Sequence, residues 1–117
     1  MASVLMPTDS RIRTYVYNEN DIYLITMETG FQSIIEFETE EKIQTISLGE
    51  NYAWSITPNE QRLIMKPLET NIRTNMTVIT NLRTYYFDLV SKSTTHDNSD
   101  IAYVIRFFYP KRVKNER

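Results

Sequence analysis

The protein has 117 residues, with 13 basic and 15 acidic residues, one histidine, no cysteine and a formal net charge of −2. This length fits one domain with its own hydrophobic core. The lack of cysteine excludes disulfides, a thiolate nucleophile and a cysteine-ligated zinc site. The mild acidity argues against a phosphate-binding surface, so we expect no nucleic-acid binding.

Strand-forming residues dominate the chain, which has eight tyrosines, five phenylalanines and only two glycines. Aromatic and β-branched side chains pack well on a pleated surface. Alternating apolar residues with turn signals between them predict about eight or nine short strands. In chain order, the expected strands cover residues 11–18, 22–27, 33–37, 43–48, 53–57, 62–66, 76–80, 85–90 and 102–109.

This pattern predicts an all-β protein, an antiparallel β-sandwich that is immunoglobulin-like in general architecture. Residues 38–42, ETEEK, could begin a short helix. A strand at 43–48 fits better, because Gly49 ends the run before a helix could lengthen. Pro58 and Pro67 are expected to bound the strands that precede them.

The flanking segments are expected to lie outside the sandwich. We expect residues 1–9 to be a flexible N-terminal segment or cloning remnant, since MASVLMPTDS lacks the features of a signal peptide. The domain would then cover residues 10–110, and the charged tail 111–117, KRVKNER, would lead into a linker. No apolar run reaches the roughly 20 residues of a membrane-spanning helix, so we expect no direct membrane insertion.

The most regular alternation lies in residues 75–90, NMTVITNLRTYYFDLV. Period two places alternate side chains on opposite faces of a strand. The expected inward-facing side chains are Met76, Val78, Thr80, Tyr85, Phe87 and Leu89. Tyr86 and Asp88 should then point outward.

Residues that could carry chemistry are few. His96 lies in a polar segment, 93–100, that we expect to be a solvated loop without a nucleophile or an orienting acid. The carboxylates Asp9, Asp21, Glu28, Glu69 and Asp88 are scattered, and the sequence places no two of them across a cleft. We therefore expect no catalytic residue, no metal site and no cofactor.

The acidic cluster Glu36, Glu38, Glu40 and Glu41 could bind a hard cation. A calcium loop, however, interleaves Asp and Asn with a Gly that this segment lacks. We expect a solvated strand face, or an edge that charge protects against pairing.

The aromatic residues have two readings. Exposed tyrosines could form a platform for a sugar, but core packing explains most of them. We expect these tyrosines to lie in or beside the core: Tyr15, Tyr17, Tyr23, Tyr85, Tyr103 and Tyr109. Trp54 is expected to be a buried core anchor.

Charge is unevenly distributed along the chain. Residues 1–60 hold ten acids and three bases, whereas residues 61–117 hold five acids and ten bases. The folded surface would have an acidic and a basic side if these halves stay apart. If strands of the two halves interleave, the field averages out, and the sequence leaves both outcomes open.

Six segments occur in an informative order: DSRI, IIEF with an acidic stretch, LGENYAWSI, LIMKP, TNMTVITNLRTYYFDL and IRFFYP. In this order they resemble the N-terminal domain of the TrbG/CagX family, the ninth VirB component of type IV secretion systems. The resemblance covers residues 9–110. It implies the following fold-determining residues: Trp54, Lys66, Pro67, Asn75, Arg83, Tyr85 and Phe87.

The resemblance implies a periplasmic β-sandwich that belongs to the core complex of the bacterial cell envelope. The expected function is that of a non-enzymatic structural domain that packs against neighbouring subunits in a ring. Implied partners are other copies of itself, the tenth VirB channel component and, through a C-terminal domain missing from this chain, the seventh VirB lipoprotein. The missing signal peptide fits this reading.

The candidate subunit contact is the acidic segment with Glu36, Glu38, Glu40 and Glu41, facing a basic side of the next subunit. The alternative function is a carbohydrate- or ligand-binding sandwich that uses exposed tyrosines.

Overall fold

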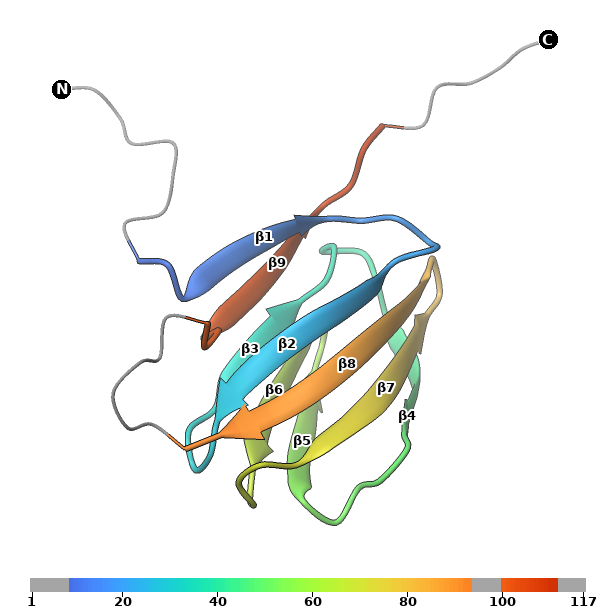
Figure 1. Cartoon of the computed structure of the whole chain (residues 1–117). Coiled ribbons are helices and arrows are strands. Elements are labelled where there is room, and N and C mark those ends of the chain that lie inside the picture. Colours follow the sequence, from blue (N-terminus) through green and yellow to red (C-terminus); the bar gives the residue numbers. More distant parts are fainter. Residues whose placement is uncertain (1–8, 94–99, 112–117) are drawn as a thin grey trace, which may run out of the picture.

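Nine strands form two sheets that pack face to face as a sandwich (Figure 1). The computed structural model describes residues 9–93 and 100–111. The strands are β1 (Ile12–Val16), β2 (Ile22–Glu28), β3 (Ser33–Glu36), β4 (Ile43–Leu48), β5 (Trp54–Asn59), β6 (Arg62–Pro67), β7 (Arg73–Thr80), β8 (Thr84–Lys92) and β9 (Val104–Phe108). The predicted all-β sandwich is confirmed. Within these residues no helix could cross a membrane.

The strand order is β1-β9-β3-β6-β5 in one sheet and β2-β8-β7-β4 in the other. The prediction of a purely antiparallel sandwich is wrong in one respect. β1 and β3 both run parallel to β9, and β2 runs parallel to β8. Parallel neighbours are joined by long connections rather than by hairpins, so no local pattern in the sequence reveals them.

Strand boundaries differ from the predictions at proline and in one polar segment. β5 continues through Pro58 to Asn59, and β6 includes Pro67. β5 is an edge strand, where proline is tolerated because a missing N–H costs no ladder hydrogen bond. β7 begins at Arg73, three residues before the predicted start at Met76. Residues 38–42 form a turn and not a helix.

The core lies between the sheets, and period two predicts its register correctly. Each of the six side chains expected to point inward from β7 and β8 is buried. Tyr86 is 42% exposed on the outer face. Asp88 also lies on this face, where Arg73 Nη2 is 2.6 Å from its Oδ2. Trp54 is 6% exposed, which confirms its predicted burial.

Aromatic rings form the largest part of the core at one end of the sandwich. Phe37 and Tyr85 have ring centroids 4.5 Å apart, and Tyr23 and Phe107 have centroids 4.9 Å apart. Tyr23 and Tyr85 are buried, and Tyr15, Tyr17 and Tyr109 pack against the core. Only Tyr103 departs from the predicted placement, because it is 45% exposed.

Gly49 permits the close approach of β4 and β7. Its N–H donates to the Asn75 carbonyl at 2.9 Å. A Cβ at Gly49 would overlap the Asn75 side-chain oxygen and would lie 3.0 Å from Thr74 Oγ1. Gly49 and Asn75 lie in two different segments that carry the resemblance, and the fold brings them into contact on neighbouring strands.

Replacing Gly49 with Ala should lower the free energy of unfolding by about 1 kcal/mol, because the new methyl group displaces the Asn75 side chain. Chemical denaturation would measure the loss. The cost should shrink in an Asn75→Ala background, where the overlap no longer exists. An equal cost in both backgrounds would show that Asn75 is not the reason for glycine at this position.

Replacing Trp54 with Ala should cost about 3–5 kcal/mol, because it removes a large buried aromatic side chain. The matched control is Tyr52→Ala, since Tyr52 is 68% exposed two residues away. Tyr52→Ala should change stability by about 0.5 kcal/mol or less. Thermal denaturation curves that coincide for both variants and the parent would contradict the assigned role of Trp54.

Candidate functional site

A buried carboxylate lies at the end of the sandwich where the chain turns from β3 to β4. Glu41 is 2% exposed. The Tyr85 hydroxyl lies 2.7 and 2.8 Å from its two oxygens, and the Thr80 hydroxyl lies 2.7 Å from Oε2. The Glu38 backbone N–H donates to Oε1 at 2.8 Å, and the Tyr109 hydroxyl donates to it at 3.2 Å. These donors replace water, which makes a buried charge tolerable.

Arg83 supplies the opposing charge. Its Nη1 lies 3.0 Å from Glu41 Oε1 and 2.8 Å from Glu38 Oε1. Its guanidinium carbon lies 3.8 Å from the centre of the Tyr109 ring, within range of a cation–π interaction. Burial alone would lower the pKa of Arg83, but the Glu38 and Glu41 carboxylates outweigh burial and raise this pKa. We call Glu41, Thr80, Arg83, Tyr85 and Tyr109 the carboxylate cluster.

The cluster's hydroxyl groups are donors rather than reactive groups. Burial raises the pKa of Tyr85 well above its usual value, and the neighbouring Tyr109 hydroxyl and Glu41 carboxylate raise it further. Burial also raises the pKa of Tyr109. Both phenols therefore remain protonated at neutral pH and donate hydrogen bonds.

The carboxylate cluster connects three segments that are distant in sequence. Glu41 belongs to the turn between β3 and β4, Thr80, Arg83 and Tyr85 belong to the β7–β8 hairpin, and Tyr109 follows β9. Thr80 also shapes the hairpin, since its hydroxyl accepts the Arg83 N–H at 3.0 Å. The Glu41 side chain has no exposed area. This arrangement can fix the end of the sandwich, but it offers a substrate no access to the carboxylate.

The acidic segment does not form the strand face that the sequence predicted. β3 ends at Glu36, and the following acids lie in the turn rather than on alternating strand positions. Glu41 is wrong as a candidate subunit contact, because its buried carboxylate bonds within the cluster. Glu36 is ion-paired with Arg106, 3.1 Å away. Glu38 and Glu40 are exposed at this turn.

The structure brings only some residues of the resemblance together. Arg83 and Tyr85 meet in the carboxylate cluster, and Phe87 is buried beside Tyr85 with ring centroids 6.2 Å apart. Pro67 is buried, whereas Lys66 is exposed. Sequence reasoning missed Glu41, Thr80 and Tyr109 as cluster members. All three lie in segments that carry the resemblance, and this was their one signal in the sequence. Nothing in the local sequence indicates that one acid of an acidic run is buried.

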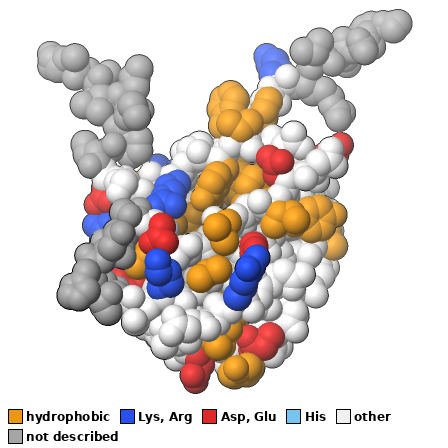
Figure 2. Space-filling view, in the orientation of Figure 1, with side chains coloured by type: hydrophobic (Ala, Val, Ile, Leu, Met, Phe, Trp, Pro, Cys, Tyr) orange, Lys and Arg blue, Asp and Glu red, His pale blue; other side chains and the backbone are white. Residues whose placement is uncertain are grey.

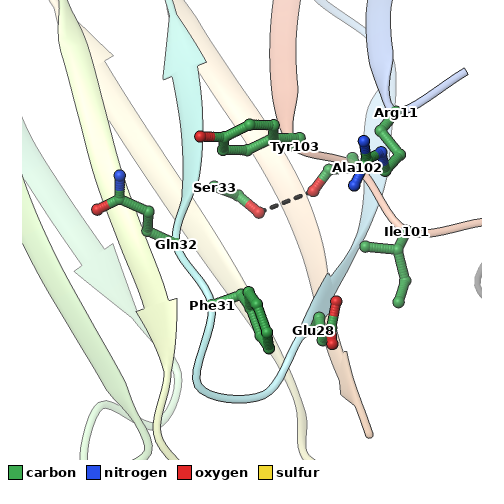
Figure 3. Close-up of a pocket in the computed structure, with 8 residues that line it drawn as sticks. All are labelled: Arg11, Glu28, Phe31, Gln32, Ser33, Ile101, Ala102 and Tyr103. Carbon is green, nitrogen blue, oxygen red and sulfur yellow. Dashed lines mark hydrogen bonds between the residues drawn. The ribbon is translucent and has the colours of Figure 1, made fainter. Parts of the chain in front are cut away.

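A pocket of about 240 Å³ lies at the start of β3 (Figure 3). Its polar groups are partly used by the protein, because the Ser33 hydroxyl donates to the Ala102 carbonyl at 2.8 Å. Arg11 at its rim is paired with Asp9, and this pairing lowers the pKa of Asp9 to about 2. Phe31 and Tyr103 are exposed beside it.

The exposed tyrosines do not gather into a platform. Tyr52 lies in the β4–β5 connection, Tyr86 lies on the outer face of the four-stranded sheet, and Tyr103 lies just before β9. The geometry therefore does not favour the alternative carbohydrate-binding function.

Acidic and basic residues intermingle on the folded surface. Each sheet contains strands from both halves of the chain, and Arg83 and Arg106 pair with acids of the first half. Figure 2 shows basic side chains beside acidic ones on the visible face. Of the two outcomes that the sequence left open, the structure therefore shows the one in which strands of the two halves interleave.

Residues 9–93 and 100–111 contain no group of three or more acidic, histidine or cysteine side chains placed to hold a metal. His96, predicted to lie in a solvated loop, falls outside the described residues.

The raised pKa values of Tyr85 and Tyr109 predict a loss of stability at alkaline pH. Unfolded tyrosine ionises near pH 10, whereas the buried phenols keep their protons. The free energy of unfolding should thus be unaffected by these groups below about pH 10 and fall above it. Each such tyrosine contributes a slope of about 1.4 kcal/mol per pH unit.

A Tyr85→Phe variant should be less stable at pH 8 by about 1–3 kcal/mol, because Glu41 loses a donor. It should also lose stability less steeply than the parent between pH 10 and 11.5. Urea denaturation across this range would measure both effects. Parallel pH profiles for the two proteins would contradict the burial of an un-ionised Tyr85.

Comparison with known proteins agrees with the resemblance seen in the sequence. The chain is 26% identical over 116 residues to the type IV secretion system protein virB9 of Bartonella henselae, covering 94% of this chain and 40% of that protein. It is 29% identical to PtlF of Bordetella pertussis, covering 87% and 44%. It is 28% identical to virB9 of Brucella abortus, covering 87% and 40%.

The chain therefore spans less than half the length of these relatives. A sequence model of the CagX family, described as a conjugal transfer protein, matches residues 10–117. Because this match covers nearly the whole chain, the protein belongs to the CagX family.

Proposed function

We propose that this protein is a non-enzymatic structural domain of a type IV secretion system core complex. Family membership and the names of the similar proteins support the assignment to this system. The observation that carries the non-enzymatic reading is the closed carboxylate cluster. Its acid has no exposed side-chain area, and its charge is balanced by Arg83.

In this proposal the sandwich, residues 10–110, is a rigid periplasmic unit that packs against neighbouring subunits in a ring. Its partners are other copies of itself and the tenth VirB channel component. The seventh VirB lipoprotein binds to a C-terminal domain of the longer protein.

The turn between β3 and β4 is the proposed acidic contact, now reduced to Glu38 and Glu40. The carboxylate cluster fixes this turn to the core, because Glu41 accepts hydrogen bonds from the Tyr85 and Thr80 hydroxyl groups. Exposed charge on a fixed turn orients an encounter with a basic surface more than it adds affinity.

Reversing the charge of this turn tests the proposal. Glu40→Lys in the full-length protein should reduce the recovery of assembled complexes from the cell envelope, because it turns attraction into repulsion. The matched control is Glu69→Lys, since Glu69 is also exposed but lies in the β6–β7 connection at the opposite end of the sandwich (Figure 1). Co-purification of the other core components would report assembly, and thermal denaturation would verify folding.

We expect fewer complexes for Glu40→Lys and normal complexes for Glu69→Lys. Normal assembly with Glu40→Lys would exclude the turn as a contact. Equal loss in both folded variants would indicate a general effect of charge.

A further inference from the structure

Among the described strands four lie at sheet edges, and three of them carry a charge, a proline or a side-chain contact that hinders pairing with another strand. Exposed edges are normally blunted by charge, by proline or by cover. β1 contains Arg13 and β5 contains Pro58. β2 ends in the charged Glu28, and its Leu24 carbonyl already accepts from the Tyr15 hydroxyl at 3.2 Å.

The fourth edge strand, β4, has the sequence Ile-Gln-Thr-Ile-Ser-Leu, with no charge and no proline. It pairs with β7 on one side, and no described strand pairs with its other side. Its single irregularity is a bulge between Ile43 and Thr45, so residues 45–48 are regular. The bulge protects the start of β4, and residues 45–48 are therefore the one stretch of edge, among the described strands, that is open to strand addition.

The hydrogen-bond pattern shows which groups of β4 are available. Gly49 donates to the Asn75 carbonyl, and bonded pairs alternate along an antiparallel ladder. Ser47 and Thr45 consequently bond to β7 as well. The N–H and C=O groups of Ile46 and Leu48 point away from β7, toward the open side.

We propose that β4 pairs antiparallel with β4 of a second copy, about a twofold axis at Ile46. Centring the pair on Ile46 lets its outward-pointing N–H and C=O bond to those of Ile46 in the second copy. In this register Ile46 faces Ile46 of the second copy and Thr45 faces its Ser47. The pairing joins two four-stranded sheets into one continuous sheet of eight strands.

Side chains in this register are complementary, and no like charges are brought together. Ile46 and Leu48 are partly buried against the core, so pairing extends the apolar layer across the junction. Thr45 and Ser47 are exposed on the opposite face. At the two ends, Lys42 of one copy comes opposite Glu50 of the other, so no like charges meet, although Glu50 Oε2 accepts the Ala53 N–H within its own copy.

The contact is small, because one strand of six residues buries much less surface than a stable interface. We expect a dissociation constant on the order of 10 μM to 1 mM for the domain. A twofold contact closes on itself and cannot build a ring. The pairing is therefore independent of the head-to-tail contacts in the proposed function, and either idea can fail without the other.

The test uses two substitutions at the exposed pair of positions. Thr45→Lys with Ser47→Lys places lysine opposite lysine twice in the proposed register. Thr45→Lys with Ser47→Glu places lysine opposite glutamate twice. Like charges directly opposite destabilise a strand pair and unlike charges stabilise it, each by a few tenths to about 1 kcal/mol. Sedimentation equilibrium over a wide concentration range would measure dimerisation of the parent and both variants.

We expect the lysine–lysine variant to dimerise about tenfold more weakly than the parent, from two unfavourable pairs. The lysine–glutamate variant should dimerise at least as tightly as the parent. In the parent, the Ile46 and Leu48 amides should exchange with solvent more slowly at high concentration than at low concentration.

A parent protein that stays monomeric at millimolar concentration would overturn the proposal. So would equal dimerisation of the two folded variants, because a contact elsewhere, or another register, does not distinguish them.

Discussion

The burial of the Glu41 carboxylate determines the local structure at the end of the sandwich that contains the β3–β4 turn. Glu41 sits in a turn at the molecular edge, where an acidic side chain would normally reach into water. It points inward instead, and hydroxyl groups from Thr80, Tyr85 and Tyr109 meet it there. Such a charge is costly unless all of its partners are present, and removal of one partner of a buried ion pair costs about 3–5 kcal/mol.

This constraint explains why the polar members of the motif around β7 and β8 occur together. Thr80 ends β7, Arg83 closes the hairpin and Tyr85 returns into the core, and all three contact the same acid. Tyr109 extends the network to the segment that follows β9. The same cluster of residues therefore contacts both the β3–β4 turn, which is proposed to contact other subunits, and the segment after β9.

The sequence predicted those features that depend on local periodicity. Alternation in β7 and β8 gave the correct inward and outward faces, and β4 has the bounds that Gly49 and the pattern predicted. Parallel pairing with β8 and β9 was not predictable, since it depends on connections that carry no local signal. The strand at Arg73–Asn75 was missed because polar residues on the outer face resemble a loop.

The candidate site was less predictable than the fold. Four glutamates in one short segment look equivalent in sequence, yet one is buried, one is paired with Arg106 and two are exposed at the turn. Their difference arises only after β3, β7, β8 and β9 have come together. The resemblance named Arg83 and Tyr85 without naming the acid that they bind.

Amide hydrogen exchange of a Glu41→Gln variant tests most directly whether the carboxylate cluster organises this end of the sandwich. Glutamine keeps the size of the side chain but removes the charge that Arg83 balances. The account predicts faster exchange in three places at once: residues 38–42, residues 80–85 and residues 108–110. The hydrogen-bonded amides of Leu68 and Asn71, in the β6–β7 connection at the opposite end of the sandwich, should keep their protection. Faster exchange confined to residues 38–42 would contradict the account, because the turn would then be held independently of the hairpin and of the segment after β9.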